Sequence, residues 1–256
     1  MRKNKTKQKL LSGEVAIGSF ISLDSPDLVE IFGIAGFDFV VLDNEHTPGN
    51  PYSVQHMLRA AELSGMDTII RIPNGEQHTI LKALDIGASG IKIPQVSDVE
   101  TVKRAVHWSH YFPEGMRGFA APRALNYGLG NSLLEELSES NEEVLLICQC
   151  ETVESFSKLD EIAAVPGLDV VFIGPYDMSQ SLGIPGQINH PNVLRVIRES
   201  IEIIRKHGKI GGIFCGTHED VQERISLGYQ YIAYSIDSGI IGNYLVNTVK
   251  QLKAIK

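Results

Sequence analysis

The feature that most constrains the fold is a regular alternation of short apolar runs and amphipathic stretches. Eight runs of β-branched or apolar residues recur along the chain, at 15–20, 37–42, 68–71, 90–93, 144–150, 168–173, 210–214 and 231–234. Most of them are continuously apolar rather than alternating in polarity. Continuous apolar runs are typical of parallel strands whose two faces are both covered by helices. The pattern therefore predicts an α/β protein with eight buried strands.

Helical patterns lie between these runs and carry their own start and stop signals. Ser25 stands before Pro26 as an N-cap would, and Gly36 follows the last apolar residue of that stretch. The expected helices cover 25–35, 53–64, 76–86, 98–109, 154–163, 192–206 and 217–227. A strand–helix unit repeated eight times in 256 residues has the size of a (β/α)8 TIM barrel. A doubly wound sheet is disfavoured, because no GxGxxG follows the first run.

Residues 13–256 are expected to form this single barrel domain. The first 12 residues, MRKNKTKQKLLS, are basic and lack the apolar segment of a secretory signal. We therefore expect residues 1–12 to be a flexible, solvated arm. The chain has no continuous apolar run of about 18 residues, so no membrane span is expected.

Charge and cysteine content narrow the class of partner and the compartment. The formal net charge of −8 argues against a general nucleic-acid surface, which needs clustered cations. A small anionic ligand stays compatible with that charge, because one well-placed arginine can bind it. The three cysteines, Cys148, Cys150 and Cys215, are few and odd in number. That count indicates a reducing compartment, and we expect a cytoplasmic protein.

Polar residues gather where the expected strands end, which is where TIM barrels place their catalytic groups. The residues at these ends are Asp43, Asn44, Glu45 and His46, then Arg71, then Gln149 and Glu151, then Gly174, Pro175, Tyr176 and Asp177, and finally Asp237. The sequence therefore predicts one polar rim assembled from distant segments.

Two acids at successive strand ends, Glu151 and Asp177, suggest a metal site. Strand alternation puts Gln149 and Glu151 on one face, while Cys148 and Cys150 face the helices as small core residues. Carboxylates without cysteine or histidine partners favour a hard divalent cation such as Mg²⁺ or Mn²⁺. The alternative is that both acids are merely solvated at the starts of loops.

The segment after the second strand supplies a candidate base, and the third strand supplies a cation. His46 could act as a general base with its imidazole oriented by Asp43, although Glu45 could take that orienting role. Arg71 would suit a carboxylate or a developing oxyanion, or would form a salt bridge to Asp43 or Glu45. Lys92 is the only lysine within the expected strands, and it is the alternative nucleophile of a Schiff-base mechanism.

Six segments taken in order resemble one known family. FDFVVLDNEH, RIPNGE, LDIGASGIKIPQV, MRGFAAPR, CQCET and FIGPYDMSQSLG look like motifs of the HpcH/HpaI aldolase family. The resemblance covers roughly residues 12 to 245. These enzymes are class II, metal-dependent pyruvate aldolases, among them 2,4-dihydroxyhept-2-ene-1,7-dioate and 2-dehydro-3-deoxyglucarate aldolases. The resemblance implies cleavage of a 2-oxo-4-hydroxy acid to an aldehyde and pyruvate, through a pyruvate enolate held on the metal.

The resemblance also implies roles for particular residues and an assembly. Glu151 and Asp177 would bind Mg²⁺, Mn²⁺ or Co²⁺, and His46, supported by Asp43, would act as the base through a water on the metal. Arg71 would stabilise the enolate. Substrate contacts would come from Gln149 and from the backbone of Gly174, Pro175 and Tyr176, and Asp85 matches a residue that approaches a neighbouring subunit's site. The family implies a homo-oligomer, often a hexamer built as a trimer of dimers, in which the last helix is exchanged between subunits.

Three departures from the usual family pattern leave other functions open. Asn44 replaces a glycine, Tyr176 replaces a smaller residue, and the loop over 111–130 differs from the common version. One alternative is a metal-dependent oxaloacetate decarboxylase, or an enzyme that forms a C–C bond from the same enolate. Another is a non-catalytic barrel that binds a small oxo acid.

Overall fold

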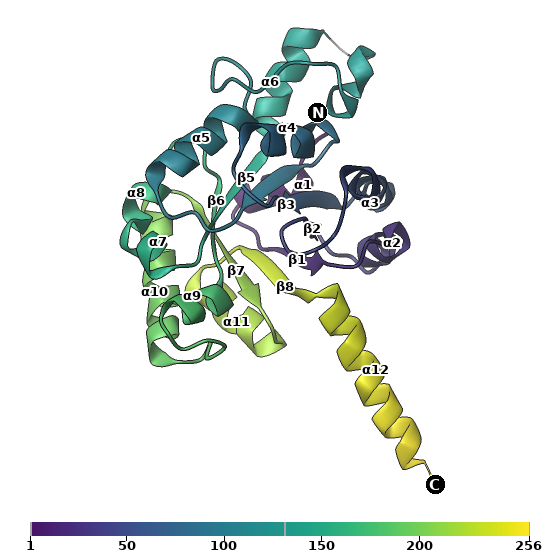
Figure 1. Ribbon diagram of the computed structural model, residues 1–256, viewed down its shortest axis with the longest axis vertical. Helices are drawn as coiled ribbons and strands as arrows, with labels where there is room; N and C mark the ends of the chain where they lie inside the picture. The colour runs from purple at the N-terminus through teal and green to yellow at the C-terminus, as the bar shows by residue number, and fades with distance from the viewer. Residues whose placement is uncertain (1, 131, 256) are drawn as a thin grey trace.

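A computed structural model describes residues 2–130 and 132–255 of the chain. Eight parallel strands close into a barrel in chain order (Figure 1). They are β1 (Ala16–Ile21), β2 (Phe39–Asp43), β3 (Asp67–Arg71), β4 (Gly90–Ile93), β5 (Leu145–Cys150), β6 (Val170–Ile173), β7 (Ile210–Cys215) and β8 (Tyr231–Ile236). The predicted (β/α)8 barrel is confirmed, and every expected strand is present with only its ends displaced.

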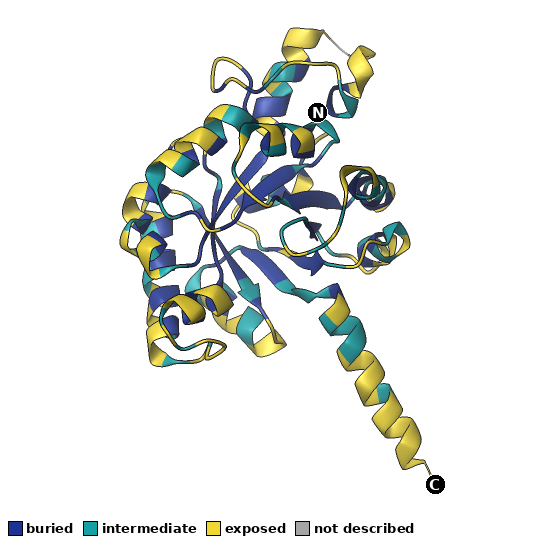
Figure 2. Ribbon diagram, in the orientation of Figure 1, coloured by how far each residue is buried: buried dark blue, intermediate teal, exposed yellow. Residues whose placement is uncertain are grey.

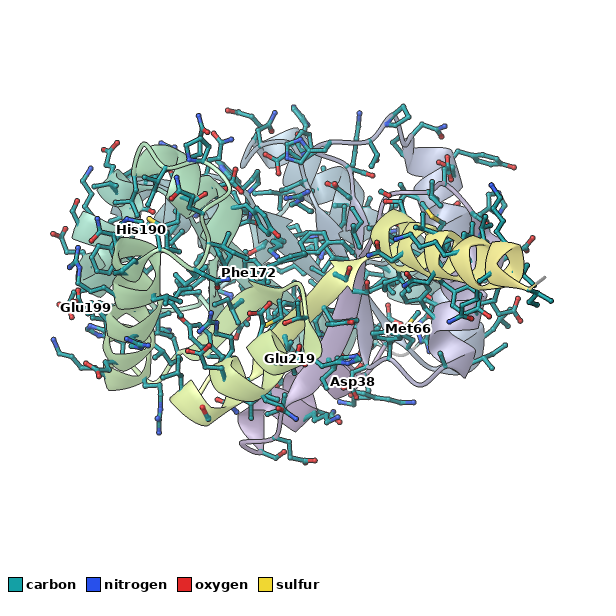
Figure 3. The ribbon with its side chains drawn as sticks, turned by 90° about the horizontal axis from the view of Figure 1, so that it is seen from below. Asp38, Met66, Phe172, His190, Glu199 and Glu219 are labelled. Carbon is teal, nitrogen blue, oxygen red and sulfur yellow. The ribbon has the colours of Figure 1, made fainter. Side chains whose placement is uncertain are left out.

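The core has two layers, because successive side chains of each strand point to opposite faces. Phe39, Phe172 and Tyr231 belong to the cluster that fills the barrel interior, and Phe172 is labelled among the central side chains in Figure 3. Cys148 and Cys150 belong to the second cluster, between the strands and the helices. This confirms the face that strand alternation predicts for the two cysteines.

Helices cover the barrel and begin at the caps that the sequence indicates. Ser25 Oγ accepts a hydrogen bond from the Leu28 amide at 3.2 Å, and Asp98 Oδ1 accepts one from the Thr101 amide at 2.7 Å. The helices that match the expected ones are α2 (Pro26–Ile34), α3 (Pro51–Ser64), α4 (Gln77–Asp85), α5 (Val99–Ser109), α10 (Pro191–Lys206) and α11 (His218–Leu227). The helix expected over 154–163 is divided at Lys158 into α7 (Val153–Ser157) and α8 (Leu159–Ala163).

The two longest connections contain structure that the sequence pattern does not indicate. Between β4 and β5 the chain forms η1 (Arg123–Gly128) and α6 (Leu133–Glu143), which lie beyond α4 and α5 at the top of Figure 1. After β6 it forms the short helix α9 (Pro175–Ser181). The start of α9 is therefore part of the rim where β6 ends.

The N-terminal segment differs from the flexible arm expected for residues 1–12. Residues Lys5–Leu11 form the helix α1, and Leu10 is 2% exposed within the interior cluster. The Thr6 amide donates to Asp67 Oδ2 at 2.7 Å, and the Asn4 amide donates to Glu143 Oε2 at 2.6 Å. Because Asp67 begins β3 and Glu143 precedes β5, α1 closes the amino-terminal end of the barrel. Met1 lies outside the described residues.

The last helix, α12 (Asp237–Ala254), leaves the barrel instead of packing on it (Figure 1). Figure 2 shows that most of its length is exposed, and Tyr244 is 71% exposed. On the outer face of β1, Ile17 is 37% exposed, and Ile34 on the neighbouring helix α2 is 76% exposed. Apolar side chains of α12 and of the outer surface at β1 and α2 are therefore both exposed to solvent. Within 2–130 and 132–255, we find no helix with the length and apolar character needed to cross a membrane.

Candidate active site

The polar residues predicted at strand ends meet at the carboxyl-terminal rim of the barrel. Asp43 and Arg71 are the last residues of β2 and β3, and they pair in the strand register. Glu151 follows β5, and Gly174 follows β6. The closed barrel thereby assembles the rim from segments more than a hundred residues apart in sequence.

A buried ion pair fixes Arg71 in position. Arg71 Nε donates to Asp43 Oδ1 at 2.9 Å, and Nη2 donates to Asp43 Oδ2 at 2.7 Å. Glu45 Oε2 lies 3.2 Å from Arg71 Nη1. Burial alone would raise the pKa of Asp43, but the hydrogen bonds and charge of Arg71 outweigh it and lower that pKa. The salt bridge considered for Arg71 from the sequence is therefore present, and it involves both Asp43 and Glu45.

His46 lies at the open side of the rim, with 67% of its side chain exposed. Its Nε2 is 3.6 Å from Glu45 Oε2, whereas Asp43 accepts only the backbone amide of His46, at 3.4 Å. The acid beside the imidazole is therefore Glu45, and Asp43 instead holds the turn and Arg71. Burial raises the pKa of Glu45, and Arg71 partly offsets that effect.

Glu151 is almost fully buried, with 2% of the residue exposed. Its Oε1 accepts the Gln95 amide at 2.9 Å, and its Oε2 accepts a hydrogen bond from Gln149 Nε2. Burial, joined by the negative charge of Asp177, raises the pKa of Glu151 to about 7. The Glu151 carboxyl would therefore need a nearby cation to be fully ionised at neutral pH.

Glu151 and Asp177 converge beside Gly174. A Cβ at position 174 would lie 2.6 Å from Glu151 Oε2 and 3.6 Å from Asp177 Oδ2, so the glycine leaves the space between the two acids open. Among the described residues, no group of three or more His, Cys, Asp or Glu side chains is arranged to hold a metal. Two carboxylates with space beside them suit Mg²⁺ or Mn²⁺, which complete their shells with water or substrate oxygens. The residues present therefore fit a hard divalent cation.

A cavity of about 180 Å³ opens next to these acids. Arg71, Gln149 and Asp177 form its polar lining, and aromatic side chains, among them Phe20 beneath the Arg71 guanidinium at 4.8 Å, form much of the rest. The buried Oε1 of Gln149 has no hydrogen-bond partner, so it is free to accept one from a bound molecule. The backbone at Gly174, Pro175 and Tyr176 also borders the cavity. The predicted substrate-contacting residues therefore share a single hollow.

Lys92, the alternative nucleophile, lies inside the barrel but not on the cavity surface. It is fully buried, and its Nζ lacks a hydrogen-bond partner. The amine lies 2.9 Å from the Phe172 ring centroid and 4.5 Å from that of Phe20. Burial lowers the pKa of Lys92 well below its usual value. The two phenyl rings separate this amine from the cavity.

Two further candidates have partners within their own chain. Asp85 Oδ1 accepts a hydrogen bond from Arg117 Nη2 at 2.7 Å. Asp237 is fully buried at the start of α12 and accepts from the Ser22 and Leu23 amides, both at 2.9 Å. Asp237 therefore ties the loop after β1 to the last helix rather than facing the cavity.

Five residues of the site were not predicted from the sequence. One is Gln95, whose backbone amide donates to Glu151. Its φ of 49° is a value that residues other than glycine rarely adopt. The other four form part of the cavity wall on β1, β6, β7 and β8, and they are Phe20, Phe172, Phe214 and Ile236. Their apolar character reads as ordinary core, so only the three-dimensional arrangement distinguishes them.

Comparison with known proteins gives a consistent assignment. The model of the HpcH/HpaI aldolase/citrate lyase family matches residues 16–243. The chain is 34% identical over 237 residues to a 5-keto-4-deoxy-D-glucarate aldolase of Enterobacter sp. (strain 638), covering 93% of this chain and 92% of that protein. It is 33% identical over 255 residues to the 2-keto-3-deoxy-L-rhamnonate aldolase of Escherichia coli (strain K12), covering 99% and 94%. The crystal structure of the citrate synthase SbnG superposes with a TM-score of 0.89 at 34% identity, covering 97% of each chain. The chain belongs to the HpcH/HpaI aldolase/citrate lyase family and is a carbon–carbon lyase.

Proposed function

We propose that this protein cleaves 2-oxo-4-hydroxy acids of the 2-keto-3-deoxy sugar acid or hydroxy-oxo-diacid type to pyruvate and an aldehyde, with a divalent cation held by Glu151 and Asp177. The observation that carries the proposal is the convergence of these two acids on Gly174, beside a cavity that Arg71 also lines. When bound, Mg²⁺, Mn²⁺ or Co²⁺ supplies a Lewis acid that polarises the 2-oxo group.

His46 is the proposed base. Its exposed imidazole, 3.6 Å from the Glu45 carboxylate, can take the proton from the 4-hydroxyl group. The C3–C4 bond then breaks, C4 becomes the aldehyde carbonyl, and the bonding electrons pass to the enolate of pyruvate. Protonation at C3 completes pyruvate. Glu45 stabilises the imidazolium that forms in the first step.

Arg71 would stabilise the negative charge that develops on the three-carbon fragment. Its guanidinium is held by Asp43 and Glu45 before substrate arrives, so little reorganisation is needed during the reaction. The unpartnered Oε1 of Gln149 and the backbone of Gly174, Pro175 and Tyr176 would orient the oxo acid in the cavity.

The second candidate function is decarboxylation of oxaloacetate, or C–C bond formation from the same enolate. The specific observation that favours it is the similarity to a structure described as a citrate synthase. The same residues would act, so the two functions differ only in substrate.

The test is pyruvate release by protein stripped with EDTA, with and without Mg²⁺, Mn²⁺ or Co²⁺, coupled to lactate dehydrogenase. We expect activity on a 2-oxo-4-hydroxy acid that returns with metal and is lost in Glu151→Gln. Glu154→Gln, which alters an exposed acid of α7, is the matched control and should keep full activity. Activity without any metal would reject the proposal, and turnover of oxaloacetate alone would favour the second function.

A homo-oligomer in which α12 docks on a second copy is also part of this proposal. The exposed Tyr244 of α12 and the exposed Ile17 and Ile34 beside β1 support it. Light scattering during size exclusion should report an oligomer, a hexamer in the family pattern, for the native chain and a smaller species for Tyr244→Asp. Leu63→Asp, on α3, is the control. A monomeric native chain would reject this assembly.

The three buried free cysteines support a cytoplasmic location.

A further inference from the structure

Tyr176 lies at the edge of the cavity, in the first turn of α9. Its ring packs edge-on against Phe214 of β7, with the two ring centroids 5.8 Å apart. Its carbonyl oxygen accepts a hydrogen bond from Ser179 Oγ at 2.6 Å, and the same Oγ accepts one from the Gly186 amide at 2.9 Å. The backbone and the ring of Tyr176 are therefore both held in place beside the cavity.

The Tyr176 hydroxyl and the Asp177 carboxylate extend in different directions from this turn. A Cβ at Gly174 would lie 3.6 Å from Asp177 Oδ2, so this carboxylate lies next to Glu151, at the proposed metal site. A Cβ at Gly216 would lie 3.9 Å from Tyr176 Oη, so the hydroxyl lies at the turn that follows β7. The hydroxyl is therefore one strand further round the barrel than the two acids.

The Tyr176 hydroxyl is available to a bound molecule. Tyr176 is 50% exposed, and within 2–130 and 132–255 its hydroxyl has no hydrogen-bond partner. The turn after β7 cannot replace it as a donor, because the amides of Gly216 and Thr217 both donate to Asp220 Oδ2, at 3.2 and 3.1 Å. Phe214 has no polar side-chain group. A polar group of a substrate that reaches this edge of the cavity would therefore find the phenol as a partner.

We propose that Tyr176 Oη forms a hydrogen bond with a hydroxyl group of the aldehyde fragment, so that Tyr176 favours substrates that are hydroxylated beyond C4. This inference rests on the proposed function, in which the carboxylate and the 2-oxo group lie at the metal and Arg71. The aldehyde fragment is then the part of the substrate farthest from the metal. The phenol can donate to a substrate hydroxyl oxygen or accept from its O–H.

Of the two substrate types proposed above, a contact with Tyr176 favours the 2-keto-3-deoxy sugar acids, which carry hydroxyl groups beyond C4. The role assigned to this one hydroxyl does not require a single chain to form the whole mouth of the site.

Deuterium exchange separates the two proposals. The methyl protons of pyruvate exchange with solvent deuterium when the enolate forms, and mass spectrometry measures the exchange with Mn²⁺ or Mg²⁺ and without aldehyde. No exchange by the native protein would reject the proposed function, and the role of Tyr176 would fall with it. Tyr176→Phe should exchange at the native rate, because it loses only a hydroxyl away from the two acids. Slower exchange in this variant would mean that the hydroxyl binds pyruvate, and would overturn the inference.

Aldol addition to two aldehydes of equal chain length tests the contact itself. Pyruvate is combined with glyceraldehyde or with propanal, which lacks both hydroxyl groups. In each addition, C3 of the enolate forms the bond to the aldehyde carbon, and the new alkoxide takes a proton. In Tyr176→Phe we expect kcat/KM for glyceraldehyde to fall by about five- to tenfold, the usual effect of one lost hydrogen bond, and kcat/KM for propanal to stay unchanged. Equal losses for both aldehydes, or no addition to glyceraldehyde by the native protein, would overturn the inference.

Tyr127→Phe is the matched control, because it removes the same atom from a tyrosine of η1 that is 59% exposed and does not line the cavity. Both kcat/KM values should stay native in this variant. Thermal unfolding checks the fold of the two proteins, and Tyr176→Phe should have the native midpoint because it keeps the ring that packs on Phe214. A loss confined to glyceraldehyde in Tyr127→Phe as well would contradict the role assigned to Tyr176.

Discussion

Arg71 and Asp43, the last residues of neighbouring strands, form a two-point ion pair with N–O distances of 2.9 and 2.7 Å. The pair is shielded, because only 11% of the Arg71 side chain and 2% of the Asp43 side chain are exposed. Removing one partner of such a pair leaves the other charge buried and uncompensated. The geometry therefore links the stability of the rim to the position of the guanidinium.

Asp43→Asn should reduce both activity and stability. We expect kcat/KM to fall by about a hundredfold, because Arg71 loses its fixed direction, and unfolding free energy to fall by about 3 kcal/mol. Urea unfolding and pyruvate release measure the two effects. Asp38→Asn, which removes a partner of Lys9 at the other end of the barrel, should leave activity unchanged. Full activity of the Asp43→Asn protein would show that Asp43 has no role in catalysis.

Glu151 should make the metal-free protein less stable as pH rises. Its pKa is raised to about 7 when folded, so between pH 4.5 and 7 the folded chain holds a proton that the unfolded chain has lost. Stability should therefore fall across this window by up to about 3 kcal/mol, and metal should oppose the loss above pH 7. Thermal unfolding in EDTA at pH 5 and pH 7.5 measures this effect.

Glu151→Gln is the comparison for that experiment, because it keeps the shape of the side chain without the titrating proton. The pH-dependent difference should shrink in this variant. The same dependence of stability on pH in both proteins would show that groups other than Glu151 cause it.

Lys92→Met should stabilise the fold and leave catalysis intact. The buried amine has no hydrogen-bond partner, so an apolar side chain of similar length should gain about 1–3 kcal/mol near neutral pH. Because the folded pKa is lowered, wild-type stability should rise with pH, and the advantage of the variant should diminish toward pH 10. Loss of all aldol activity would instead support the Schiff-base alternative.

Leu10→Ala tests whether α1 belongs to the barrel. Leu10 fills the interior cluster, so its truncation should cost about 2–4 kcal/mol. The adjacent Leu11 is 69% exposed, and Leu11→Ala should cost less than about 0.5 kcal/mol. Equal denaturant midpoints for the two variants would mean that α1 does not close the barrel in solution.

The fold could be predicted from the sequence where local pattern and strand geometry coincide. Continuous apolar runs identify all eight strands, and parallel strands in a closed barrel bring Asp43, Arg71 and Glu151 to one rim. Helix α1 could not be predicted, because a seven-residue helix that buries Thr6 and Leu10 has too short an apolar pattern to stand out among lysines. It depends on tertiary contacts that the local sequence does not reveal.

The details of the site could be predicted only in part. Spacing left Asp43 and Glu45 as equal partners for His46, and only the path of the turn puts Glu45 beside the ring. The apolar part of the cavity lining could not be predicted, because Phe20, Phe214 and Ile236 become neighbours only when β8 closes against β1.

Ile236 belongs to two structures at once, the cavity wall and the N-cap of α12. The next residue, Asp237, is held by the loop after β1, and Ser235 before it has a φ of 54°. Ile236 therefore joins the direction of the last helix directly to the lining of the cavity. Docking of α12 on a second copy, as proposed above, would thus act on the shape of the cavity through a single residue, Ile236.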